Sequence, residues 1–515
     1  MLTNVGVMAI AIITAIPLAV IAGRNLLLFP AIYFTIEMIF TKADLNLVLL
    51  GRAITTSRIF LLVFLFTFFI QCFLKRKNII KDILALLKSN KVLTTFVVIY
   101  FLSPVVLALH SYFIFGIFPK YVFRIVIMSS WGFILGFLLP VDNENFSRMI
   151  KYWGIRAIVI VIFFFPQSIY YYLSTNFNSI SRTYYIDATK DAFLQFFYFL
   201  PQNPNACSAR PCNWLFVDTF NKNGLSVGLF TSFFFLVNYY FTKRNLKRLL
   251  ILSFTTLFIH YFLFINKGFA TIMTFIITIG LYCATDLLYT FILQKKPFTK
   301  TSLIVPAILL IMIGHTGWQD FNRLAVPMIK KKIETVFQVN FEDKSHNKEI
   351  KYRDIVFHSQ FASRFTIHGA DNGGGDIIQG RLSYTFYRGG KMLREYPLKG
   401  YGPYANDPDP KVQKDFYAAT TGHANIVDSI IVFGVLSGLF AHPEFFFPLL
   451  LLLFVNFRKV EFKFASFWIT YFIGSFLLAF FDKYGGITPH VAFQIMMVSI
   501  FIRYLKKENA FRFMS

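Results

Sequence analysis

The sequence predicts an all-α polytopic membrane protein with about 12 to 14 transmembrane helices and a large, mostly helical cap outside the membrane. The first observation is composition: of 515 residues, 56% are hydrophobic, 15% are charged and 67 are Phe, whereas soluble domains are about 45 to 50% apolar. The second is the recurrence of apolar runs of about 17 to 25 residues, the length that crosses a bilayer as a helix. The third is that basic residues gather in the short connections between those runs.

The apolar runs fall into two groups separated by a long polar segment. The first run lacks a basic segment before it and a small-residue cleavage site after it, so we expect a resident helix rather than a signal peptide. The chain thus divides into transmembrane residues 1–316, a polar loop at 317–434 and a C-terminal membrane part at 435–515. The runs lie near residues 3–22, 25–40, 57–74, 93–109, 121–140, 153–173, 223–242, 247–265, 268–294, 302–316, 435–457, 464–481 and 488–503.

The basic residues indicate which side of the membrane each connection faces. A net charge of +25 by itself would suit a nucleic-acid-binding protein, but these cations lie between apolar runs, where they face the anionic lipid of the cytoplasmic leaflet. We therefore expect membrane lipids and no nucleic acid as partners. The same rule assigns the loop at about 174–222 and the loop at 317–434 to the outside. The cytoplasmic connections contain "KRKNIIK", "SRMIKYWGIR", "TKRNLKR", "QKKPFTK", "FRKVEFK" and "RYLKKENAFR".

Two cysteines, Cys207 and Cys212, lie close together in the loop assigned to the outside. In an oxidising compartment they are candidates for a disulfide, with Pro211 shaping the turn between them. Two free thiols are the alternative. Two lone cysteines do not make a metal site, and the acidic residues of "GADNGGGD" and "NDPDP" fit turn chemistry. We expect no metal and no cofactor.

The polar loop at 317–434 mixes both charge signs with apolar residues at helical spacing, which predicts a folded cap. Within it, "IIQGRLSYTFYRGGKMLREYP" is typical of an amphipathic helix or helix pair that ends before Pro397. Arg381 and Arg388 lie two turns apart on one face of this helix. They form a candidate anion-binding row, and a solvated basic face is the alternative.

A glycine-rich turn and a histidine follow this helix. In "YPLKGYGPY", Gly400 and Gly402 allow a tight turn and close approach of the backbone to a partner. His423, in "GHANIVDSII", lies where the cap chain returns to the membrane, beside a helix that we expect to begin around residues 424–425. Because an imidazole titrates near neutrality, His423 is a candidate general base, although most histidines are structural.

Two cations lie at the outer ends of apolar runs. Lys267 stands in "LFINKGFATIM", between two hydrophobic stretches, and Arg124 stands in "KYVFRIVIMSS". Ionisable residues in such positions are functional candidates by default. The alternative is that their side chains extend to the lipid headgroups.

Three segments in order resemble the O-antigen ligase and O-antigen polymerase family of bacterial envelopes. They are "DTFNKNGLSVGLF", "LFINKGFATIM" and "RLSYTFYRGGKMLREYPLKGYGPY", the last leading to "GHANIVDSIIVFGVLSGLF". The resemblance covers roughly residues 215–457, and the first 200 residues are similar only in being membrane spans. The positions that fit the family pattern are Pro397, Gly400, Gly402, His423, Asn425, Gly434 and Gly438; Lys267 stands where the family more often has Arg, and Val432 where many members have Glu.

The resemblance implies glycosyl transfer at the periplasmic face of the bacterial inner membrane, with a glycan on undecaprenyl pyrophosphate as donor. His423 would be the general base for the acceptor hydroxyl. Arg381 and Lys267, with Arg388 or Arg124, would stabilise the departing pyrophosphate. The further substrate-binding candidates are Gly400, Tyr401, Gly402 and Asn425. Tyr396, Tyr401 and Tyr404 would stack on sugars, or alternatively anchor and pack the loop.

Family resemblance leaves two reactions. A polymerase joins lipid-linked repeat units, with a chain-length regulator as a candidate partner, whereas a ligase moves a finished glycan to a lipid A core acceptor. The long chain, the large cap and the cysteine-bearing loop favour the polymerase. A flippase or other transporter of lipid-linked oligosaccharides is the alternative of a different class, and it should show internal repeats and polar residues near mid-membrane.

Overall fold

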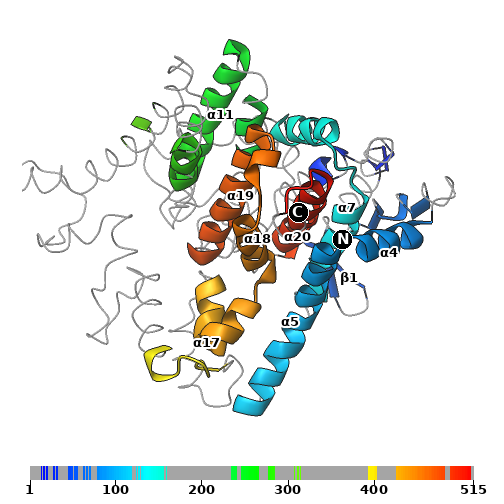
Figure 1. The fold of residues 1–515 in the computed structure, drawn as a ribbon, viewed down its shortest axis with the longest axis vertical. Coiled ribbons are helices and arrows are strands. Elements are labelled where there is room, and N and C mark those ends of the chain that lie inside the picture. Colours follow the sequence, from blue (N-terminus) through cyan, green and yellow to red (C-terminus); the bar gives the residue numbers. More distant parts are fainter. Residues whose placement is uncertain are drawn as a thin grey trace, which may run out of the picture.

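The computed structural model describes part of the chain. Its continuous stretches are residues 78–116, 129–155, 233–240, 245–265, 276–284, 393–402, 425–481 and 488–511. It also describes a hairpin at 44–49 and 52–55, and scattered helical positions within 13–32, 62–70, 118–127, 158 and 307–314. Figure 1 draws these parts as ribbon.

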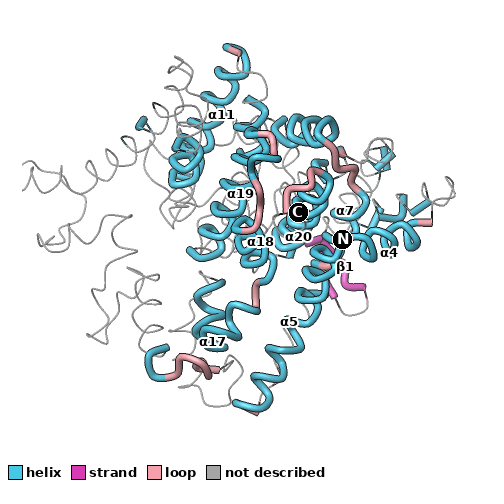
Figure 2. The backbone as a smooth tube through the Cα atoms, viewed as in Figure 1, coloured by secondary structure: helices cyan, strands magenta, loops and turns pink. Residues whose placement is uncertain are grey.

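Helix predominates in the described residues, as Figure 2 shows. The exception is an antiparallel pair of strands, β1 (Asp44–Leu49) and β2 (Arg52–Thr55). The helical prediction is confirmed for the described residues; the hairpin lies at this connection, where leucines alternate with other residues before Gly51, a pattern of period two. The helices are α4 (Ile79–Ser89), α5 (Lys91–Phe115), α7 (Trp131–Leu138), α11 (Leu246–Ile265), α17 (Asn425–Phe440), α18 (Pro443–Leu453), α19 (Phe462–Phe481) and α20 (Thr488–Lys507), with a 3-10 turn η6 at Phe457–Lys459.

Asparagine caps set the start of α4 and the junction of α4 with α5. The side chain of Asn78 accepts a hydrogen bond from the Lys81 N–H at 3.0 Å, and Asn90 accepts one from the Leu93 N–H at 3.2 Å. Both satisfy N–H groups that a helix start leaves unpaired. Asn90 also ends α4, because its φ of −123° and ψ of 86° are not helical, so α5 starts in a new direction.

Helix α5 is long and apolar enough to cross a membrane, and it is the single helix of the described residues that is so by itself. Helices α17 and α18 also reach the required length and apolarity if they are counted together as one span. The pair is bent by 49°, and Phe464–Phe480 within α19 is a shorter apolar helix. One side of α5 packs on the core through Leu93, Phe96 and Tyr100. The other side presents an exposed apolar stripe at helical spacing, formed by Val98, Phe101, Leu102, Val105, Leu109, Tyr112 and Phe113.

The core lies around α20, which α7, α18 and α19 surround (Figure 1). Helix α7 approaches α20 closely because Gly132 and Gly136 have no side chain: a Cβ on either would overlap Ala492 or Ser499. Aromatic rings fill the other side. Trp468 of α19 stacks on Phe146 at 5.1 Å between centroids and contacts Phe501 of α20 at 5.0 Å.

Several of the basic connections meet at one end of this bundle. Lys459, in the connection after α18, donates to the Asn509 carbonyl at 3.0 Å. Lys506, at the end of α20, donates to the carbonyl of Ser89 at the end of α4. The start of α5 therefore lies beside the last turn of α20, whereas residues 396–402 contact the opposite end of α5.

The guanidinium of Arg503 holds this end of the bundle together. It donates to the carbonyls of Gly136 and Leu139 at 2.6 and 2.7 Å, where α7 ends. We expect Arg503→Met to lower the free energy of unfolding by about 1.5 to 3 kcal/mol, because two carbonyls lose a charged donor. Thermal unfolding in detergent would measure the loss.

Arg148 provides the matched control for this substitution. It pairs with Glu144 one turn away, and its side chain is 57% exposed. Exposed pairs of this kind contribute little, so Arg148→Met should change stability by less than about 0.5 kcal/mol. Equal effects at the two positions would contradict a stabilising role for Arg503.

Candidate functional site

The glycine-rich segment predicted from the sequence forms a turn in the structure. The Gly400 N–H donates to the Tyr396 carbonyl at 2.9 Å, which closes the turn. Gly400 and Gly402 have φ angles of 74° and 98°. These positive values lie in the region that glycine enters without steric cost, so both glycines of the turn are required by its backbone.

This turn, residues 396–402, is seated against a break in α17. Helix α17 begins at Asn425, within the range that the sequence predicts, but Gly434 has φ 77° and ψ 171°, which no helix contains. The break frees backbone groups, and the turn pairs with them. The N–H groups of Tyr401 and Gly402 donate to the carbonyls of Ile431 and Val432 at 2.8 and 2.9 Å.

A third hydrogen bond runs the other way, from the Val435 N–H to the Pro397 carbonyl at 2.9 Å. A buried peptide group left without a partner is costly, so these three bonds make the break tolerable in an apolar setting. We call the paired unit, residues 396–402 together with residues 431–435, the turn–break junction.

The break divides α17 into two half-helices, residues 425–433 and 435–440, that fold against each other. A Cβ on Gly438 would overlap the backbone of Ser429 and Ile430, although in a straight helix position 438 lies about 12 Å along the axis from position 430. The run near 435–457, predicted as one continuous span, therefore contains the second half-helix, 435–440, and α18, with a break at residues 441–442 where the helix pair is bent by 49°. Gly434, whose φ is positive, lies just before this run and sets the direction of its first part.

The C-terminal end of α5 borders the junction. His110 makes an edge contact with Phe433 at 6.4 Å between ring centroids. The ammonium of Lys399 lies 5.5 Å from the ring centroids of both Phe115 and Tyr396. Tyr401 packs against Val427 and Ile431, which favours loop packing over sugar stacking for this side chain. Tyr396 remains 44% exposed.

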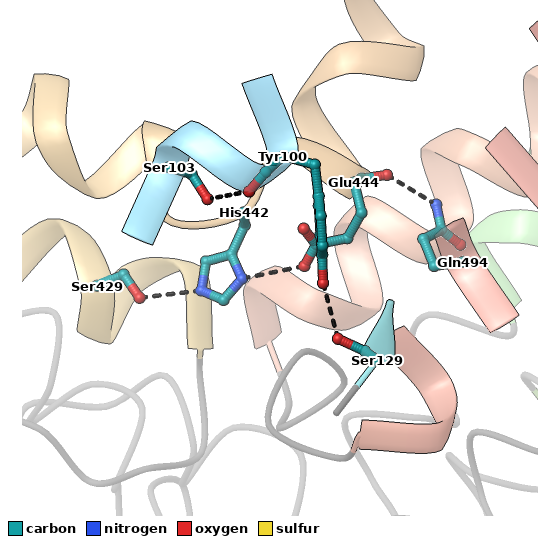
Figure 3. Close-up of polar contacts among 7 residues, drawn as sticks. All are labelled: Tyr100, Ser103, Ser129, Ser429, His442, Glu444 and Gln494. Carbon is teal, nitrogen blue, oxygen red and sulfur yellow. Dashed lines mark hydrogen bonds and ion pairs between the residues drawn. The ribbon is translucent and has the colours of Figure 1, made fainter. Parts of the chain in front are cut away.

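A second group of polar side chains lies at the open end of the folded half-helices (Figure 3). The Ser429 hydroxyl and His442 Nε2 are 2.9 Å apart, and His442 Nδ1 is 3.3 Å from a Glu444 carboxylate oxygen. The carboxylate is deeply buried, since Glu444 is 3% exposed. A buried carboxylate needs a partner, and His442 provides it.

Hydrogen bonds continue from Glu444 into the core. Gln494 of α20 donates its amide N–H to the Glu444 carbonyl at 3.2 Å, and it accepts from the Tyr471 hydroxyl of α19 at 2.8 Å. Ser429, His442, Glu444, Gln494 and Tyr471 thus form one chain of contacts, which we call the polar chain. Tyr100 of α5 lies beside Glu444 in Figure 3, with its hydroxyl 2.7 Å from that of Ser129.

The sequence analysis missed the polar chain. His442 and Glu444 flank Pro443 inside the run at 435–457, which was taken as an uninterrupted apolar span. Two ionisable residues beside a proline within such a run are the signal that indicates a functional or broken helix.

Most of the residues proposed from the sequence lie outside the described part of the chain. These are His423, Arg381, Lys267, Arg388, Arg124, Cys207 and Cys212. Of the others, Gly400, Tyr401 and Gly402 lie at the break, residues 431–435, whereas Asn425 begins the half-helix at its opposite end. In the described ranges, no three His, Cys, Asp or Glu side chains gather as a metal site would require.

Compared with protein-family models and with curated proteins, the chain matches none.

Proposed function

We propose that this chain is an O-antigen polymerase of a bacterial inner membrane. It would join oligosaccharide repeat units carried on undecaprenyl pyrophosphate, at the periplasmic face. The observation that carries the proposal is the turn–break junction. The motif residues Pro397 and Gly402, which carry the family resemblance, form hydrogen bonds with Val435 and Val432, which lie far away in the sequence. The motif glycines Gly400 and Gly434 lie against each other, because a Cβ on Gly400 would overlap the Gly434 backbone.

A polytopic membrane fold is part of this proposal, and two features support it. The exposed apolar stripe along α5 is the kind of surface that lipid covers. The cations of several connections gather near the start of α5, and the turn lies at its other end. By the positive-inside rule the turn would then face the periplasm.

The proposed chemistry needs a base and fixed cations. His423, two residues before α17, would accept the proton of the acceptor hydroxyl as it attacks the anomeric carbon. The bond from that carbon to the pyrophosphate oxygen breaks, and the undecaprenyl pyrophosphate leaves as an anion. Arg381 and Lys267, with Arg388 or Arg124, would stabilise that charge. The growing glycan and the incoming repeat unit are thus donor and acceptor.

A ligase that transfers a finished glycan to a lipid A core uses the same chemistry and fits the same described geometry.

A transporter of lipid-linked oligosaccharides is favoured by a different observation. Its sites are typically formed by broken helices with polar groups at mid-membrane, and α17 is a broken helix that contacts the polar chain. The large outer loop carrying the motifs favours an enzyme.

Lipopolysaccharide from a strain lacking this gene, separated on gels, would distinguish the three functions. We expect core bearing one repeat unit in the deletion strain and a full ladder after complementation with the wild-type gene. Core without repeats, together with accumulated long lipid-linked chains, would indicate a ligase. An unchanged ladder would refute both enzymes. Repeat units retained on the cytoplasmic side would indicate the transporter.

A further inference from the structure

We infer that Ser429, His442 and Glu444 are positioning residues for the reaction proposed above: they fix the half-helix 425–433, whose first residue is Asn425. The inference rests on the proposed function for its catalytic consequence, but its structural part does not. It starts from the fact that the first half-helix is short and is interrupted at Gly434.

A half-helix of this length needs contacts at both ends. Isolated helices shorter than about 12 to 15 residues are marginally stable. At the break, three backbone hydrogen bonds to the turn hold residues 431–435. At the open end, the described side-chain hydrogen bond from this half-helix to α18 is that of Ser429 with His442. Ser429 is one helical turn after Asn425, so this bond restrains the rotation of the first turn.

His442 is itself held in place. It immediately precedes α18, and its Nδ1 faces the Glu444 carboxylate in the first turn of that helix. The Glu444 backbone in turn accepts from Gln494, which Tyr471 orients. Because many buried residues of the core belong to α19 and α20, the polar chain ties the half-helix to the packed core.

The contacts also use both ring nitrogens of His442. A carboxylate oxygen accepts, so Nδ1–H faces Glu444, while Nε2 is bonded to the Ser429 hydroxyl, which can either donate or accept. Removal of the carboxylate would free the imidazole to rotate. The hydroxyl bond to Ser429 would then be lost, although Ser429 itself is unchanged. The three residues are therefore expected to act as one unit.

The first test is independent of activity. Hydrogen–deuterium exchange on the full-length protein would follow the amides of 425–433 in Ser429→Ala, His442→Gln and Glu444→Gln. We expect exchange there to rise about tenfold or more in each variant, since local opening becomes easier, with little change in α19 and α20. Unchanged exchange in all three would overturn the inference.

Ser475→Ala is the matched control, and Ser429→Thr the rescue. Ser475 is a buried serine of α19 whose hydroxyl makes no hydrogen bond in the described structure, so its loss should leave exchange of 425–433 unchanged. Ser429→Thr keeps the hydroxyl and should restore protection. If Ser475→Ala loosens 425–433 as much as Ser429→Ala, the effect is general packing and the inference fails.

The second test measures the rate of glycan transfer. We expect the three variants to lower kcat by about 10- to 100-fold with a nearly unchanged KM for the lipid-linked donor, since misplaced groups slow the chemical step. The double variant Ser429→Ala/His442→Gln should be no slower than the slower single variant. The pH at half-maximal rate should stay where it is in the wild type.

The outcomes separate the possibilities. A lost rising limb of the pH profile in His442→Gln would make His442 the base and overturn its positioning role. Covalent labelling of Ser429 by a fluorophosphonate would make it a nucleophile, with the same consequence. A wild-type protein that transfers no glycan refutes the proposed function, while the exchange experiment still decides whether the polar chain holds the half-helix.

Discussion

Gly434→Ala is expected to destabilise the protein by about 4 kcal/mol or more, which is exceptional for the addition of one methyl group. Two causes act together. Gly434 has φ 77°, where an L-residue costs about 1 to 2 kcal/mol. In addition, the new Cβ would overlap the Leu398 carbonyl, and relief of that overlap separates the turn from α17 and leaves three backbone hydrogen bonds unmade. Thermal unfolding of the purified protein would measure the loss.

Gly116→Ala separates the two causes. Gly116, which ends α5, also has a positive φ, 67°, with ψ 12°, but a Cβ there meets nothing within 4 Å. This variant should show the cost of the left-handed helical region alone, about 1 to 2 kcal/mol; at Gly434, where ψ is 171°, the conformational cost is at least as large. Gly400→Ala should resemble Gly434→Ala, since its Cβ would overlap the Gly434 backbone. Similar losses at positions 116 and 434 would mean that the junction is looser than described.

The second large effect is expected at His423, which the proposed function makes the general base. His423→Ala should slow glycan transfer by about 100- to 10,000-fold, because no other group would accept the proton of the acceptor hydroxyl. The purified variant would be assayed with lipid-linked repeat units, and elongated product measured on gels.

Membrane level and thermal stability provide the control for this variant. Both should stay near the wild-type values, because a base is not required for folding. Equal loss of folded protein and of activity would favour a structural role for His423. Full activity in a normally folded variant would remove it from the site.

Much of the described architecture follows from local patterns. The predicted spans near 93–109, 464–481 and 488–503 lie within α5, α19 and α20, because a run of apolar residues without charge indicates a buried or lipid-facing helix whatever its neighbours. The start of α17 and the turn at Gly400 and Gly402 were also predictable, since caps, glycines and prolines act on the backbone within a few residues.

The structure differs from the sequence predictions where one segment carries two patterns that predict different structures. In the connection at 44–55, leucine alternation produced strands within a chain of helices. In the run at 435–457, overall apolarity concealed His442 and Glu444, and the span length expected there did not allow for a helix that reverses at Gly434. Average composition cannot detect such a reversal, because it depends on the φ angle of one residue.

Local chemistry along the chain was thus sufficient for the helical character of the described residues, since that depends on short apolar runs. The meeting of Pro397 with Val435 and of Ser429 with His442 depended on the tertiary structure. A broken helix exposes peptide groups and buried charges that its own segment cannot satisfy. Their partners come from wherever folding brings a complementary group, and no local pattern specifies that.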